Sequence, residues 1–417
     1  MKGALTKKVT ENLKETIHSE EFKKKAKTKE SAFSRNRKLS FCDIISFMIT
    51  TSKRCLQTEL NIFCKKTGRD SVSRQAYSKA RENIKPEAIR ELNENISTQI
   101  EKDARLKTYR GYRLISVDGS VLDLPSNEKL KEHFGCVTNG TNVSHAAALA
   151  MIAYDVLNNI ALWGELYSYY DSEKKRIFDI IEDIKKRDTT KNPLFLLDRG
   201  YPSFDLMFQL SENKQNYLIR ASSNSLKEIN EATQEDQQIT ITRKGKKITL
   251  RVINIKLSNN VTEKLLTNLD ETFSIEDFKT LYAKRWRIET SYHYIKNSQL
   301  LECFTGESIN AIHQDFYISL VVMNIAATMY MEQIREIEKY ENYRELKYNP
   351  SFSALIFDIK NDFAKYLCSK NMKTNFIKQY FQYKTIMQFA YAVVPDRNRI
   401  RHSARHSKFK GHRKNIL

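Results

Sequence analysis

The hydrophobic pattern of the chain changes its period at Arg113. Residues before it read as helical, whereas "RLISVDGSVLDLP" is rich in β-branched and apolar residues, which favours extended structure. The pair Asp118-Gly119 inside this run is a hairpin signal. "HAAALAMIAYDVLNNIALWGELY" then predicts two strands joined at Asn158-Asn159, because asparagine tolerates the left-handed backbone of tight turns. Three successive strands predict an antiparallel meander.

The segments after the meander alternate between helix and strand. "SEKKRIFDIIEDIKKR" has helical amphipathic spacing with basic residues in its last turn, and "PLFLLDRGY" begins as a short apolar run suited to a strand buried on both faces. Strand, strand, strand, helix and strand is the element order of a ribonuclease-H-like core, so the sequence predicts an α/β fold of this kind. A helix near residues 203–212 and the strand "NYLIRAS" continue the pattern.

A second β-rich stretch delays the next helix. "QQITITRKGKKITLRVINIKL" alternates apolar and polar residues around a basic turn that contains glycine, which predicts strands inserted at about residues 213–272. From Ser274 onward the pattern is helical again. We therefore expect a helical basic region at residues 1–107, an α/β domain with the insertion at 108–330, and a helical region with a basic tail at 331–417.

The charge of the chain favours a polyanionic partner. Seventy Lys and Arg against 50 Asp and Glu give a formal charge of +20, which points to nucleic acid or an anionic membrane surface. The membrane alternative is weak, because the most apolar stretch, residues 316–331, contains Asn324 and is shorter than the roughly 20 residues of a span. The tail "RNRIRHSARHSKFKGHRKN" is a type of segment that usually orders only on meeting phosphate. Six scattered cysteines and the lack of an apolar leader favour a reducing compartment.

One stretch near residue 70 has the spacing of a helix-turn-helix. A helix is expected to stop near Gly68, and Ser71 or Ser73 can cap the next one. A plain helical hairpin with a solvated basic face explains the pattern equally well. If the second helix lies in a DNA groove, its basic residues would make the contacts. These residues are Arg74, Lys79 and Arg81.

The stretch "YAKRWRIETSYHYIK", residues 282–296, carries two stripes. At about 100° per residue, its polar residues at offsets 0, 3, 7 and 14 fall within an arc of about 60°. An apolar stripe at positions 281, 288 and 295 predicts that the helix packs one edge and presents the other. A solvated face with an i,i+4 pair worth about 0.2 to 0.5 kcal/mol is the simpler explanation of the polar stripe. The polar residues are Tyr282, Arg285, Glu289 and Lys296.

Three acidic residues occupy positions from which they can converge. Asp118 and Asp198 end apolar runs, and Glu289 lies on the helix after the insertion. Magnesium prefers such oxygen ligands, and two ions about 3.5 to 4 Å apart can activate the attacking oxygen and stabilise the leaving one in a displacement at phosphorus. The rest of the polar stripe would then bind phosphate beside the reacting bond. Although an Asp before Gly is more often a turn former, the joint placement favours the active-site hypothesis.

At this point the sequence resembles the DDE transposases of the insertion-sequence-four family. The spacing of Tyr282, Arg285, Glu289 and Lys296 fits the four-residue signature of that family at every position. "VDGS" resembles the block that holds the first acid, "LLDRGY" the block of the second, and "SRQAYSKAR" a segment of the N-terminal region. The likeness covers roughly residues 50–330.

The resemblance implies an enzyme that moves DNA. It would nick the transposon ends, free a 3′-hydroxyl and join it to target DNA, using Mg²⁺ or Mn²⁺ held by a catalytic triad. Its partners would be double-stranded DNA, as terminal inverted repeats and target, and a second copy of the chain in a homodimer on paired ends. A prokaryotic cytoplasm, at the nucleoid, would be its location. The triad would be Asp118, Asp198 and Glu289, with Tyr282, Arg285, Lys296 and Arg199 on DNA phosphates.

Two other functional hypotheses remain as alternatives to a transposase. One is a DNA-binding protein derived from a transposase, with binding kept and catalysis lost. The other is a ribonuclease-H-like nuclease that acts on structured nucleic acid. The presence of all three acids and of the whole polar stripe argues against the first, and the basic N-terminal region against the second.

Overall fold

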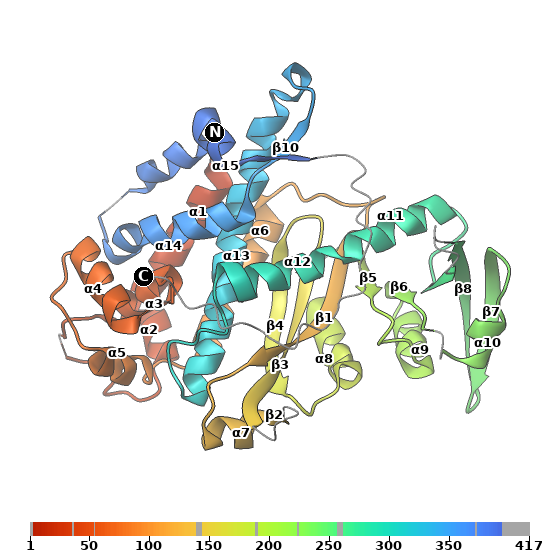
Figure 1. Ribbon diagram of the computed structural model, residues 1–417, viewed down its shortest axis with the longest axis horizontal. Coiled ribbons are helices and arrows are strands. Elements are labelled where there is room, and N and C mark those ends of the chain that lie inside the picture. Colours follow the sequence, from red (N-terminus) through yellow and green to blue (C-terminus); the bar gives the residue numbers. More distant parts are fainter. Residues whose placement is uncertain are drawn as a thin grey trace.

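The architecture is a mixed α/β fold, as predicted (Figure 1). Most helices gather at one end of the molecule, and strands reach from them to the other end. The basic tail, residues 397–415, lies outside the described part of the chain. The computed structural model describes residues 3–35, 37–53, 55–138, 144–187, 191–222, 225–256, 262–371 and 373–393.

A mixed sheet forms the centre of the molecule. Its strands in the described residues are β1 (Arg113–Asp123), β2 (Cys136–Thr138), β3 (Ser144–Asp155), β4 (Ile160–Ser168), β5 (Pro193–Leu197), β6 (Asn216–Arg220), β7 (Asp236–Arg243), β8 (Lys246–Lys256) and β9 (Thr262–Thr267). β3 is antiparallel to both β1 and β4, which confirms the predicted meander. β1 is parallel to β5, and β5 is parallel to β6.

β1 runs through Asp118 and Gly119 without a turn, so the hairpin predicted there is wrong. Asp118 pairs with Ile152 of β3, and Gly119 pairs with Met151. Pairing with β3 along the length of β1 outweighs the turn preference of the Asp-Gly pair. A Cβ atom at Gly119 would lie 2.5 Å from Oε1 of Glu173, so this glycine makes room for a carboxylate of a neighbouring helix.

The predicted tight turns are present elsewhere in the sheet. Asn159 has a φ of 58° between β3 and β4, and Lys244 and Gly245 have φ values of 49° and 75° between β7 and β8. Two consecutive positive φ values are typical of the two-residue turns that match the twist of a hairpin. β9 is antiparallel to both β8 and β6. β9, β8 and β7 therefore extend the central sheet beyond β6.

Helices cover the sheet and connect its strands. α8 buries Ile177, Ile180, Ile181 and Ile184, at helical spacing, against β1 and β4. Each fully buried isoleucine stabilises the packing by roughly 1.5 to 3 kcal/mol. The helices of this part are α7 (Glu128–Phe134), α8 (Glu173–Lys185), α9 (Phe204–Glu212), α10 (Lys227–Glu231), α11 (Ile275–Arg285), α12 (Arg287–His293) and the π-helix η1 (Tyr294–Ser298).

The remaining helices form a helical body around one long buried helix, α13 (Ile309–Glu338), which contains the apolar stretch at 316–331. In the described part of the chain, no helix is long and apolar enough to cross a membrane. The others are α1 (Ala4–His18), α2 (Glu20–Ala26), α3 (Phe41–Thr50), α4 (Leu56–Thr67), α5 (Arg74–Arg81), α6 (Pro86–Asp103), α14 (Phe352–Cys368) and α15 (Tyr383–Phe389), with the short helices η2 (Glu341–Tyr343) and η3 (Thr374–Phe381). Two short strands, β10 (Lys347–Asn349) and β11 (Tyr391–Val393), pair with each other.

α13 joins the helical body to the sheet. The Asn324 side chain donates to Asn93 Oδ1 of α6 at 2.8 Å and to the Ala161 carbonyl of β4 at 2.9 Å. Its Oδ1 accepts from the Ala161 N–H at 2.8 Å. A polar residue in an apolar helix is thus fully used, as a buried amide must be to avoid a desolvation cost. Apolar residues of the body and of the sheet belong to one continuous core.

The connection between α6 and β1 is fastened along its length. Lys107 exchanges two hydrogen bonds with the Asn158 side chain, at 2.8 and 2.9 Å. The Tyr109 hydroxyl donates to Asp277 of α11 at 2.6 Å. Arg113, at the start of β1, is buried and lies 3.3 Å from Glu101 of α6. The segment is therefore part of the packed structure.

Candidate active site

Two of the predicted acids lie at matching levels of neighbouring parallel strands, Asp118 within β1 and Asp198 directly after the end of β5. The last pair recorded in the β1–β5 ladder is Ser116 with Leu196, and Asp118 and Asp198 each follow two residues later. Because parallel neighbours keep their register, the two carboxylates leave the sheet at the same level. Their side chains are 20% and 33% exposed.

The third predicted acid approaches from a helix. Glu289 lies on α12 and is 49% exposed, and its Oε1 accepts a hydrogen bond from Arg285 Nη2 at 3.1 Å. The i,i+4 pair expected from the sequence is therefore present. The structure brings Asp118, Asp198 and Glu289 to one guanidinium group.

Arg285 lies among the three carboxylates. Its Nη1 is 3.9 Å from Asp118 Oδ2, and its Nη2 is 3.8 Å from Asp198 Oδ1, both longer than a hydrogen bond. The side chain is 2% exposed, and its Nε and Nη1 have no hydrogen-bond partner within the described residues. A buried cation that faces several acids, yet is poorly hydrogen-bonded, is available to another anion.

The stretch 282–296 is a broken helix, unlike the continuous one expected. α11 ends at Arg285, α12 begins at Arg287, and η1 adds a π-helical turn around Lys296. π-helical turns occur frequently at functional sites. The apolar stripe behaves as predicted, because the residues at 281, 288 and 295 are buried.

The other two stripe residues also contact strands near the acids. Tyr282 is buried and its hydroxyl donates to Asp198 Oδ1 at 3.3 Å, while burial raises the pKa of this phenol to about 12. Lys296 donates to the Val121 carbonyl of β1, and its Nζ is 3.4 Å from Glu302 Oε1. Both side chains are held beside the site by these contacts.

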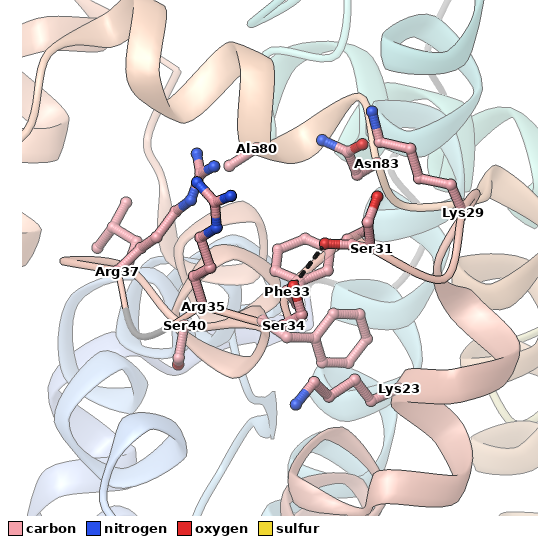
Figure 2. A pocket seen from close by; sticks show the side chains of 13 residues that line it. Lys23, Lys29, Ser31, Phe33, Ser34, Arg35, Arg37, Ser40, Ala80 and Asn83 are labelled. Carbon is pink, nitrogen blue, oxygen red and sulfur yellow. Dashed lines mark hydrogen bonds between the residues drawn. The ribbon is translucent and has the colours of Figure 1, made fainter.

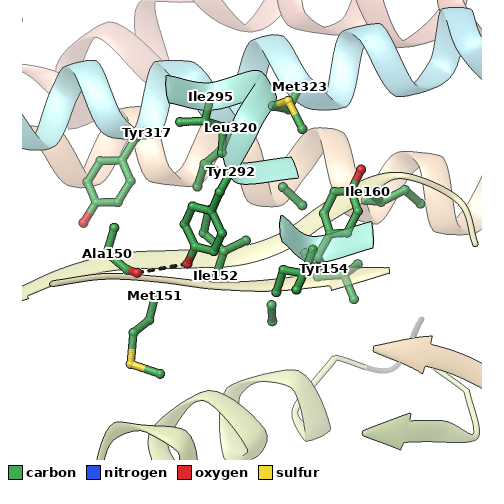
Figure 3. Packing of buried hydrophobic residues seen from close by; sticks show 14 of the residues in the cluster. Ala150, Met151, Ile152, Tyr154, Ile160, Tyr292, Ile295, Tyr317, Leu320 and Met323 are labelled. Atoms are coloured by element: carbon green, nitrogen blue, oxygen red, sulfur yellow. Dashed lines mark hydrogen bonds between the residues drawn. The ribbon is translucent and has the colours of Figure 1, made fainter. Parts of the chain in front are cut away.

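Tyr292, which the sequence analysis did not single out, fixes α12 onto the sheet. Its hydroxyl lies 2.7 Å from the Asp118 carbonyl and 2.9 Å from the Ala150 carbonyl and can donate to either. Figure 3 shows Tyr292 and Ile295 between β3 and the α13 residues around Leu320. The tyrosine therefore sets the height of the Glu289 helix above β1. Only its place in an apolar face hinted at this role.

A fourth carboxylate, Glu173, was also missed. It opens α8 beside Gly119, and its Oε2 accepts a hydrogen bond from Tyr201 at 2.8 Å. Burial, followed by the negative charge of Glu173, raises the pKa of Asp118 to about 7, although Arg285 opposes this rise. An acid in the first turn of a helix is ordinarily explained by the helix dipole, so the local pattern does not single out Glu173.

The other predicted DNA-binding residues differ in their exposure to solvent. Arg74, Lys79 and Arg199 are exposed, and Ser73 caps α5 by accepting from the Ala76 N–H, as the helix-turn-helix spacing predicted. The prediction that Arg81 contacts DNA does not fit its position. It is buried and pairs with Asp315 of α13 at 2.8 Å, because α5 turns this residue inward.

The donor chemistry fits a hard divalent cation, since the carboxylates offer only oxygen ligands. As the side chains lie, no three His, Cys, Asp or Glu residues within the described ranges are close enough to hold one ion. Arg285 instead supplies the positive charge between the acids. Loading a metal would therefore involve movement of these side chains.

Comparisons with known proteins point to one class. A protein of Sinorhizobium fredii that carries a provisional transposase name is 25% identical over 153 residues, which are 32% of this chain and 43% of that protein. The match thus spans less than half of that relative. The piggyBac transposase, solved as a synaptic complex with hairpin DNA, has a similar fold with a TM-score of 0.50 at 10% identity, over 92% of this chain and 86% of that one.

The family match covers the part of the chain in which the acids lie. The model described as "Transposase DDE domain" matches residues 109–325, which is more than half of the sequence. This range contains β1, β5 and α12, and with them Asp118, Asp198 and Glu289. The chain therefore belongs to the transposase DDE domain family.

Proposed function

We propose that this protein is an active DNA transposase that cuts the ends of an insertion sequence and transfers the 3′-hydroxyl to target DNA. One observation carries the proposal: Asp118 in β1, Asp198 just after β5 and Glu289 in α12 all face Arg285. A structural ion pair needs one acid for one arginine. Three acids around one cation make a site with excess negative charge, which suits cations of higher charge.

In this proposal the three acids hold Mg²⁺ or Mn²⁺, which would polarise the phosphodiester and lower the pKa of the attacking hydroxyl or water. The role of Arg285 is to bind the phosphate, since its fork is suited to two phosphate oxygens and two of its nitrogens lack a protein partner in the described part of the chain. The buried Tyr282 and the tethered Lys296 orient that phosphate. Arg199, exposed beside Asp198, contacts the adjoining DNA backbone.

A ribonuclease-H-like core is part of the proposal. The order β4-β3-β1-β5-β6, with three antiparallel strands followed by two parallel ones, supports it. On this basis we assign residues 108–330 to the catalytic domain and, within the predicted range of about 213–272, β7, β8 and β9 to an insertion in it. Residues 1–107 would bind transposon ends, and 331–417 would form the helical C-terminal region, although both regions pack around α13.

The partners follow from the charge and the relatives. The formal charge of +20 supports binding of double-stranded DNA, both as terminal inverted repeats and as target. Arg74 and Lys79, exposed on α5, would contact the ends. We further propose a homodimer on paired ends, membership of the insertion-sequence-four group on the signature at 282–296, and a place at the prokaryotic nucleoid.

The test compares Asp118→Asn with the wild-type protein on a supercoiled plasmid that carries the DNA flanking the coding region. We expect Asp118→Asn to abolish nicking with Mg²⁺ or Mn²⁺ and to retain binding in a gel-shift assay. Asp179→Asn, at an exposed position of α8, is the matched control and should nick like the wild type.

Three results would contradict the proposal. Absence of nicking by the wild-type protein with either metal would favour a DNA-binding protein without catalysis. Cleavage that ignores the terminal sequence would favour a nuclease. Loss of DNA binding together with cleavage in Asp118→Asn would give this residue a structural role.

A further inference from the structure

A basic pocket opens in the helical body, far along the chain from the acids. Its volume is about 550 Å³, and it lies between the segment after α2 and the end of α5. No Asp or Glu from the described residues lines it. Its basic side chains are Lys23, Lys29, Arg35 and Arg37 (Figure 2).

The two arginines of this pocket are available to a ligand. Arg35 and Arg37 are exposed, and neither guanidinium group has a hydrogen-bond or ion-pair partner within the described ranges. In Figure 2 both side chains reach toward Ala80 of α5, while Lys29 lies at the other side of the opening, near Asn83. The pocket thus presents positive charge from more than one side.

The segment just before Arg35 is held in shape. Phe33 has a φ of 57°, a left-handed conformation that costs a bulky residue about 1 to 2 kcal/mol. Its ring packs edge-on against Phe41 with centroids 5.3 Å apart, and Ser34 Oγ donates to the Ser31 carbonyl at 2.8 Å. Strained backbone of this kind persists only where the surroundings fix it, and it often occurs at ligand sites.

The same segment is tied to the end of α5. The Thr28 N–H donates to the Asn83 carbonyl at 3.0 Å, and the Lys85 N–H donates to the Ala26 carbonyl at 2.7 Å. Ala80 and Asn83 line the pocket, and Lys79 is exposed on the same helix. The pocket and the basic side of α5 therefore keep a fixed relative position.

We propose that this pocket binds backbone phosphates of the DNA that α5 contacts, with Arg35 and Arg37 as the principal donors. The inference rests on the proposed function and adds a second contact to the end-binding region. Guanidinium forks bind phosphate oxygens in pairs, and contacts of this type fix the register of a protein on a duplex. None of the large apolar side chains that are exposed in the described chain lines the pocket, which disfavours a membrane surface.

The test uses the full-length double variant Arg35→Gln/Arg37→Gln. We expect about tenfold weaker binding to the end-containing duplex, measured by fluorescence anisotropy. Each lost phosphate contact lowers the salt dependence of log K by about 0.9, so the slope should fall by about 1.8. Hydroxyl-radical footprinting should lose protection at a few adjacent sugars while the protection due to α5 remains.

Two comparison variants make the result specific. Lys102→Gln/Lys186→Gln removes the same charge from exposed positions at the ends of α6 and α8 and should keep the wild-type slope within error. Arg35→Lys/Arg37→Lys keeps the charge and should recover most of the slope. Equal thermal unfolding temperatures for all variants exclude a folding defect, as expected for exposed side chains.

The outcomes separate this inference from the proposed function. If the wild-type protein binds the end duplex and the Arg35/Arg37 variant binds with the same slope, the pocket proposal alone is wrong. If the variant instead loses only its binding to phosphatidylglycerol vesicles, the ligand is a membrane and the proposal is also wrong. Failure of the wild-type protein to bind end DNA overturns both.

Discussion

Two buried arginines of this protein have opposite surroundings. Arg81, in the helical body, donates to Gln314 Oε1 at 2.6 Å, to the Ala311 carbonyl at 2.8 Å and to Asp315 Oδ1 at 2.8 Å, with a further bond to Thr305. Arg285, beside the sheet, makes one hydrogen bond within the described part of the chain and faces three acids. The first has its donors satisfied by protein. Arg285 keeps two nitrogens, Nε and Nη1, without a hydrogen-bond partner in the described residues.

The acids beside the two arginines differ in the same sense. Burial would raise the pKa of Asp315, but the charges of Arg81 and Lys53 outweigh it and the pKa is lowered. Burial and Glu173 raise the pKa of Asp118 to about 7 despite Arg285. The Arg81–Asp315 pair favours the charged form of its carboxylate, whereas the surroundings of Asp118 disfavour the charged form. This contrast separates Arg81, which is satisfied within the fold, from Arg285, for which we propose a functional role.

The largest expected effect is the loss of stability on substitution of Arg81. Arg81→Ala would leave Asp315 buried without its partner, and breaking a buried pair in this way costs about 3 to 5 kcal/mol. Urea denaturation should show this loss in the free energy of unfolding. Arg74→Ala, at an exposed position of the same helix, is the control and should change stability by less than about 0.5 kcal/mol. Equal losses in the two variants would contradict the contrast.

The next effect concerns Arg285, which we propose to bind phosphate. Arg285→Gln should slow nicking about 10² to 10³-fold, the usual result of removing one donor that stabilises transition-state charge. Its unfolding free energy should change by less than about 1 kcal/mol, because the acids it faces are partly exposed and can be hydrated. Single-turnover nicking and urea denaturation measure the two quantities. A large loss of stability with unchanged nicking would make Arg285 structural.

The smallest effect is a pH dependence. The folded pKa of Asp118 is raised, so the unfolded chain loses this proton first, and stability falls as pH rises from about 4 to 7. Asp118→Asn removes that cost, and without metal it should be more stable than the wild type at pH 8 and equal to it near pH 4. Denaturation across this pH range checks the sign. A gain that is constant with pH would contradict it.

The sequence predicted most of the sheet because its signals are local. The change of period at Arg113, the Asn158-Asn159 turn and the alternation of the insertion each depend on neighbours within a few residues. The apolar stripe of 282–296 was also readable, since burial follows helical spacing. The hairpin at Asp118-Gly119 failed because strand β3, about 30 residues away along the chain, decides that conformation.

Side-chain partners were harder to foresee. The basic face of α5 was visible, but whether Arg81 turns inward depends on α13, more than 200 residues later. Glu173 and Tyr292 enter the site only through the packing of α8 and α12 on β1. The break at Trp286 divides a segment whose pattern reads as one helix. These features arise from tertiary contacts that local spacing does not contain.

The fastened connection between α6 and β1 has a consequence for how such an enzyme measures DNA. Lys107, Tyr109 and Arg113 are each bonded to the sheet or its helices, so the region that would bind an end cannot swing relative to the acids. If this region binds the end, the distance between the bound sequence and the acids would be constant. The number of base pairs between the recognised sequence and the cut would be set by the fold, and every copy of the enzyme would cut with the same offset.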